Sequence, residues 1–119
     1  MQNNLTLYAN SKEAHFKMLY SAFDIVNNIN EKIAELSSST GDNNLSMYEN
    51  AKNELLRKRI RFIQFSAMLP YKQEKVLEMR CEKGMSWKSI ATALQLGVAT
   101  VKQIFNQIET DAEKYGGIF

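Results

Sequence analysis

Residues 98–108 carry the side chains whose types and spacing best suit a defined chemistry, hydrogen bonding to nucleic-acid bases. On a helix, the apolar residues of this stretch would turn inward: Val101, Ile104, Phe105 and Ile108. The outward face would then hold Ala99, Thr100, Lys102, Gln103 and Asn106. Lysine can donate to guanine, glutamine can bind adenine with both amide atoms, and the methyl group of alanine or threonine packs on thymine. The alternative is an exposed helix that simply carries polar residues.

Five further residues are candidates for holding phosphate groups. Ser86 and Lys88 stand at the start of the preceding predicted helix, where free backbone N–H groups and the helix dipole favour an anion. Arg57, Lys58 and Arg61 belong to the densest basic run of the chain, residues 57–61. Such a run can hold the DNA backbone or contact an acidic protein surface. It can equally be a solvated helix face, in which a glutamate four residues earlier pairs with Lys58.

Residues of other chemistries form no recognisable site in the sequence. His15 has no second histidine or cysteine near it, and Cys81, as the single cysteine, rules out an internal disulfide and a multi-cysteine zinc site. We find no glycine-rich phosphate loop and no arrangement of a nucleophile with its base. We therefore expect neither an enzyme nor a bound metal or cofactor.

Three predicted helices position the base-facing residues. The first covers residues 71–83 and follows Pro70, and it is closed by Gly84, which can adopt the left-handed conformation of a helix end. Ser86 caps the second helix, which runs to Leu94, and a short turn at 95–97 leads into the third, at 98–115. This order is typical of a helix-turn-helix, whose second helix enters the major groove of DNA.

Two long helices are predicted before this unit, after a polar arm at residues 1–10. Following Ser11 as N-cap, apolar residues recur every three or four positions over about 25 residues: Leu19, Ala22, Val26, Ile29, Ile33 and Leu36. This seam can pack inside the monomer or join two copies, and both arrangements stay open, with a homodimer as our expectation.

The second long helix is predicted over residues 45–68, after a polar linker at 37–44. Its apolar row is predicted to be Leu56, Ile60, Ile63 and Ala67, with Tyr48, Leu55 and Phe62 beside it. The solvated side is predicted to hold Glu54, Arg57, Lys58, Arg61 and Gln64.

Composition and charge fit a folded, helical chain with a basic C-terminal half. One proline and five glycines are too few for the many turns of an all-β chain, and no apolar run approaches a membrane span. The net charge of +2 hides a concentration of positive charge, because residues 57–102 hold ten Lys or Arg against three Asp or Glu. A concentration of positive charge on the predicted helix-turn-helix is what binding to DNA phosphates requires. We expect a cytoplasmic protein.

The C-terminal residues resemble the helix-turn-helix of sigma-70-type factors that reads the upstream promoter element. The likeness rests on Leu69-Pro70, Val76-Leu77, Arg80, Gly84, Ser86-Trp87, Ile90-Ala91, Leu94, Leu96 and Thr100-Val101-Lys102. The same module is found in small phage and mobile-element regulators of the ArpU and RinA kind. The resemblance implies base contacts from Ala99, Lys102 and Gln103 and raises RNA polymerase as a partner. Two residues depart from the pattern: Gln95 replaces the turn glycine, and Gly97 replaces the Ser or Thr cap.

Together these observations predict an all-α chain, with an N-terminal helical hairpin at residues 1–68 and a helix-turn-helix module at 69–115. The expected function is a DNA-binding transcriptional regulator of phage or mobile-element type, which binds double-stranded DNA and forms homodimers through its N-terminal helices. One alternative is a protein-interaction module that binds RNA polymerase or another host protein. The other is an accessory protein of DNA packaging or recombination.

Overall fold

The computed structural model describes residues 11–37 and 44–119, and these residues are all-α, as predicted. The predicted arm at 1–10 and nearly all of the predicted linker lie outside the described residues. The elements in chain order are α1 (Lys12–Tyr20), α2 (Ala22–Ser37), α3 (Asn44–Ala67), α4 (Tyr71–Leu77), the π-helical turn η1 (Glu78–Glu82), α5 (Trp87–Leu94) and α6 (Val98–Tyr115). Within the described ranges, no helix has the length and apolar character needed to cross a membrane.

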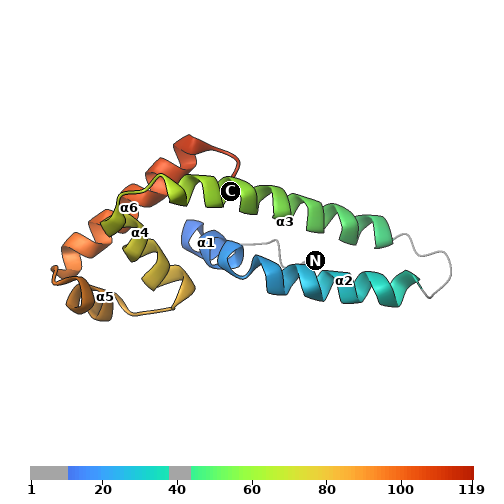
Figure 1. Ribbon diagram of the computed structural model, residues 1–119, viewed down its shortest axis with the longest axis horizontal. Coiled ribbons are helices and arrows are strands. Elements are labelled where there is room, and N and C mark those ends of the chain that lie inside the picture. The colour runs from blue at the N-terminus through green and yellow to red at the C-terminus, as the bar shows by residue number, and fades with distance from the viewer. Residues whose placement is uncertain (1–10, 38–43) are drawn as a thin grey trace.

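The molecule is elongated, measuring 57 × 26 × 25 Å. Helices α2 and α3 lie side by side as a long antiparallel hairpin, and α4, α5 and α6 gather at the end where α3 finishes (Figure 1). Helix α1 packs against both η1 and α3. The hairpin therefore projects from the C-terminal helices, and α1 lies at the junction.

The first long helix differs from its prediction because the chain turns at Ser21. Ser11 caps α1 as predicted, with its hydroxyl accepting from the Ala14 N–H at 3.0 Å. At Ser21 the backbone leaves the helical conformation (φ −94°, ψ 13°), and its N–H is shared between the carbonyls of Lys17 and Met18. The predicted single helix is therefore two helices, and this turn lets α1 pack on the C-terminal helices while α2 runs along α3.

The apolar seam of these two helices is used mainly inside the chain. Leu19, Ala22 and Ile29 are buried, and the other seam residues are partly buried. Helix α3 is the main neighbour of α2. Internal packing thus occupies the seam that the sequence left open between monomer and dimer.

The predicted apolar row of α3 is wrong. Ile60 and Ile63 have 56% and 48% of their surface exposed, whereas the buried residues lie on the opposite face: Ala51, Leu55, Phe62 and Phe65. Both faces of α3 carry apolar residues, and the face with the two phenylalanines packs because aromatic side chains bury the larger area. Of the predicted row, Leu56 is partly buried, and Ile60, Ile63 and Ala67 are left at the surface.

One hydrophobic core joins the hairpin to the C-terminal helices, so buried residues lie on both sides of the predicted boundary at residue 68. Phe16 of α1 shows this best, since its ring lies 5.6 Å from that of Phe62 and 6.0 Å from that of Phe105. The division into two units remains a prediction.

The last four residues fold back onto α1. Ile118 is fully buried, and the ring of Phe119 lies 5.4 Å from the rings of both Phe16 and His15. Gly116 and Gly117 have φ of 83° and 80°, values that L side chains rarely adopt, and these two residues turn the chain after α6. The sequence analysis assigned no structure to this tail.

Candidate nucleic-acid interface

The helix-turn-helix is built by local signals that act as predicted. Gly84 ends the first helix with φ of 67°, and the Ser86 hydroxyl caps α5 by accepting from the Ser89 N–H at 3.1 Å. Gln95 ends α5 in the left-handed conformation (φ 58°, ψ 46°), which residues other than glycine rarely adopt. Gly97 precedes α6 without any side-chain cap, as its lack of a hydroxyl predicts.

The inner faces of α5 and α6 are locked together by buried residues. Ile90, Val101 and Ile108 are fully buried, and Phe105 is nearly so. Ala91 is also buried, and its small side chain lets the two helices approach closely. The orientation of α6 is thus set by its apolar face, which leaves the other face free.

Arg80 fixes this unit to the rest of the chain. Its guanidinium lies 4.0 Å from the Trp87 ring centroid, donates to the Met85 carbonyl at 3.0 Å, and pairs with Glu13 of α1 at 3.1 Å. Trp87 in turn packs edge-on against Phe105 at 5.3 Å. The sequence analysis assigned no role to Arg80, because its acidic partner lies 67 residues away in the chain.

All five predicted base-facing residues lie exposed near the start of α6: Ala99, Thr100, Lys102, Gln103 and Asn106. The helical repeat puts Ala99, Gln103 and Asn106 on one side, with Lys102 at its edge and Thr100 further round. The side chains of Lys102 and Gln103 make no hydrogen bond or ion pair within the described part of the chain. They are therefore available to a ligand.

The predicted phosphate-binding residues are not equivalent. Lys88 is exposed on the first turn of α5 without an ion pair among the described residues, beside Ser86, whose hydroxyl donates to the Ser89 hydroxyl at 2.9 Å. Arg57 of α3 is also exposed, and it forms no ion pair with the described residues. Lys58 pairs with Glu54 at 3.6 Å, as predicted, but its side chain is only 18% exposed, so it does not lie on a solvated face.

Arg61 is occupied by the far end of α6. Its guanidinium donates to the carbonyls of Tyr115 at 2.8 Å and Gly116 at 3.1 Å, and it lies 4.2 Å from the Tyr115 ring centroid. A cation at a helix C-terminus neutralises carbonyls that lack helical partners. Arg61 thus holds the tail. It lies at the end of α6 opposite to Lys102, and its contact with phosphate stays a prediction.

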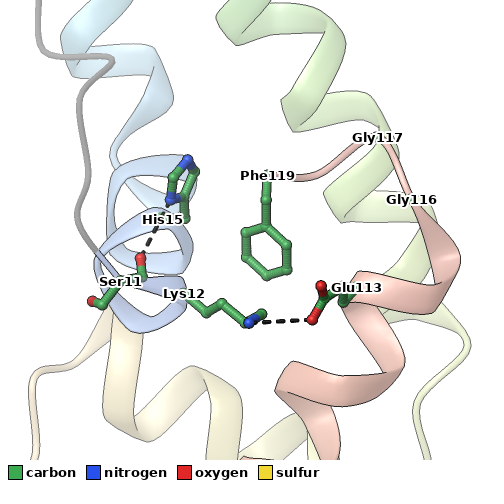
Figure 2. A pocket seen from close by; sticks show the side chains of 7 residues that line it. All are labelled: Ser11, Lys12, His15, Glu113, Gly116, Gly117 and Phe119. Atoms are coloured by element: carbon green, nitrogen blue, oxygen red, sulfur yellow. Dashed lines mark hydrogen bonds and ion pairs between the residues drawn. The ribbon is translucent and has the colours of Figure 1, made fainter.

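An open cavity of about 430 Å³ lies between α1, the end of α6 and the tail, away from the base-facing residues. Figure 2 shows the Phe119 ring between His15 and the ion pair that joins Lys12 to Glu113 at 3.2 Å. Burial lowers the pKa of His15, and a hydrogen bond with the Ser11 carbonyl opposes this shift. No group of residues suited to hold a metal occurs in the described ranges.

Cys81 is buried beneath α1, and burial raises the pKa of its thiol to about 12. A thiol with this pKa is almost entirely protonated at neutral pH and therefore unreactive. Cys81 is therefore a small packing residue of the hydrophobic core.

In a comparison with known families, residues 59–106 match the model described as sigma-70, region 4. Comparisons with curated proteins and with solved structures give no match. The matched segment runs from the second half of α3 into α6 and includes every predicted base-facing residue, together with Arg61, Ser86 and Lys88. This part of the chain is similar to a helix-turn-helix of the DNA-binding kind, whereas α1, α2 and the part of α3 that holds Arg57 and Lys58 lie outside the match.

Proposed function

We propose that the protein is a sequence-specific DNA-binding transcriptional regulator, of the type found in phages and mobile elements, and that α6 enters the major groove. The observation that carries this proposal is the division of α6 into two faces. One face is locked into the core by Val101, Phe105 and Ile108, and the other presents Lys102 and Gln103 without partners. A rigid helix with free polar side chains near its start is the arrangement that reads base edges.

In this proposal each exposed residue of α6 has a defined role. Lys102 donates to guanine, Gln103 binds adenine with its amide, and Ala99 and Thr100 pack on thymine methyl groups. Asn106, one turn further on, contacts a base or a phosphate. Lys88 and Ser86 hold one stretch of backbone beside α5, and Arg57 and Lys58 supply positive charge from α3.

Selection of DNA sites from a pool of random duplexes tests this function. We expect the wild-type protein to enrich one short motif. The Gln103→Ala variant should lose the preference at one base pair and retain it elsewhere, because each side chain reads its own base. Gln107→Ala is a matched control, since Gln107 is an exposed glutamine on the same helix that bonds Asp111 at 2.9 Å. Enrichment of no motif by the wild-type protein would contradict the proposal.

A second candidate function, binding to RNA polymerase or another host protein, is favoured by the exposed isoleucines of α3. Apolar side chains grouped at a surface are typical of protein contacts and do not suit phosphate groups. The proposal includes a homodimer formed through the N-terminal helices. Because the seam of α1 and α2 packs inside the monomer, such a dimer must use another face of these helices.

A further inference from the structure

Arg80, in the π-helical turn η1, is held by three different groups at once. Its Nε donates to a carboxylate oxygen of Glu13 at 3.1 Å, and its Nη1 donates to the Met85 carbonyl at 3.0 Å. The guanidinium also lies 4.0 Å from the centroid of the Trp87 ring. Only 22% of the Arg80 side chain and 25% of the Glu13 side chain are exposed. Because a charge-assisted hydrogen bond is stronger where water is partly excluded, this ion pair holds Arg80 firmly.

The contacts of Arg80 enclose the start of α5. Met85 and Trp87 are the residues directly before and after Ser86, which is the N-cap of this helix. Lys88 follows on the first turn and is exposed. Arg80 thus holds the backbone on one side of Ser86 and an aromatic ring on the other. The position of Arg80 therefore sets the orientation of the turn that carries two of the proposed phosphate-binding residues.

Glu13 of α1 is the acidic group that fixes the position of Arg80. No other carboxylate of the described residues forms an ion pair with Arg80. Lys17, which is half exposed, also pairs with Glu13, at 3.0 Å. Helix α1 is itself anchored, because Phe16 is fully buried and packs against aromatic rings of α3 and α6. Since α1 lies outside the segment matched by the family model, residues 59–106, the helix-turn-helix is oriented in part by a residue from elsewhere in the chain.

We propose that Glu13 is a positioning residue of the DNA interface, which holds Arg80 so that Ser86 and Lys88 meet a phosphate of the DNA backbone. This inference rests on the proposed function and adds α1 to the part of the chain that determines DNA binding. Glu13 acts through Arg80 and does not itself contact DNA. Its removal has a distinctive sign: loss of a negative charge alone raises affinity for DNA, whereas loss of a positioning residue lowers it.

The salt dependence of DNA binding tests this role. We expect Glu13→Ala to lower the affinity for DNA and to reduce the slope of log K against log salt concentration by about 1, as the loss of the Lys88 contact in Lys88→Ala does. A chain that carries both substitutions should show no further reduction, because both remove the same phosphate contact. Glu113→Ala is the matched control: it removes an equal charge from an ion pair with α1, at 3.2 Å, and should keep the wild-type slope.

Fluorescence of Trp87 tests the same contacts without DNA, because Trp87 is the single tryptophan of the chain. Loss of Glu13 should release Arg80 from the ring and expose the ring to water. The emission of folded Glu13→Ala should therefore shift to longer wavelength, whereas that of Glu113→Ala should not. Glu13→Gln keeps the size and one acceptor oxygen of the side chain without its charge. It should retain the fold by circular dichroism and lie between wild type and Glu13→Ala in both measurements.

Two results would overturn this proposal. Wild-type emission and slope in Glu13→Ala would show that Arg80 keeps its place without Glu13, and reductions in slope that add in the double variant would show that Glu13 and Lys88 affect different contacts. The proposed function fails separately, if the wild-type chain enriches no motif in the selection experiment. The salt slope can then still be measured on unrelated DNA, because phosphate contacts do not depend on sequence. A wild-type chain that binds no DNA at all would refute both.

Discussion

Replacing Ile118 by alanine tests whether the C-terminal tail is part of the folded structure. Ile118 is fully buried in the same core as Phe16, and Arg61 holds the segment before it through the carbonyls of Tyr115 and Gly116. Truncation of a buried isoleucine to alanine costs about 2–5 kcal/mol. Because a chain end can relax into the space that is vacated, we expect a loss near the lower limit, about 2–3 kcal/mol of unfolding free energy.

Urea denaturation followed by circular dichroism measures this loss, in dilute solution where the chain is monomeric. Ile60→Ala provides the matched control, because it removes the same atoms from a side chain that is 56% exposed. Its unfolding free energy should change by less than about 0.5 kcal/mol. If the two variants lost equal stability, the tail would not be packed on α1 and the reasoning would fail.

Three further predictions concern single residues. Gln95→Gly should raise the unfolding free energy by about 0.5–1 kcal/mol. Glycine removes the cost of the left-handed conformation at this position, and its greater flexibility in the unfolded chain offsets part of that gain. An unfolding free energy no higher than that of Gln95→Ala would refute this. Stability should fall as the pH drops through about 6.5, since the lowered pKa of His15 lets the unfolded chain bind a proton before the folded chain does. This fall in stability should be absent in His15→Gln. At lower pH the raised pKa of Glu109 has the opposite effect, because the folded chain then binds a proton before the unfolded chain does and gains stability. Cys81 should react with iodoacetamide far more slowly in the native chain than in urea, and equal rates would contradict its burial.

The helix-turn-helix could be predicted because its signals are local. Gly84, Ser86 and Gln95 each act on the backbone within a few residues, as a helix end, a cap and a turn, and each does so in the structure. The exposure of Lys102 and Gln103 could also be predicted, because the apolar residues of α6 recur on a single face of the helix and leave these two side chains on the other.

Features that depend on distant partners were not predictable. Two apolar faces of α3 compete for the core, and the choice of Phe62 over Ile60 depends on α1 and the other helices that pack there. Arg61 belongs to a basic run in the sequence, but its acceptors lie 54 and 55 residues away. The apolar period in the sequence runs through Ser21 without a break, so the turn there was not predictable, and it places α1 against η1 and α3.

The most direct test of DNA reading is equilibrium binding of the wild-type chain and the Lys102→Ala/Gln103→Ala variant to the selected site and to unrelated DNA, at several salt concentrations. The double variant should lose about 2 kcal/mol or more of preference for the site. Its binding to unrelated DNA should fall only slightly, because the other cations still contact phosphates. Equal affinity of wild type and variant for the site, or equal affinity of wild type for both DNAs, would contradict the assignment of α6 as the reading helix.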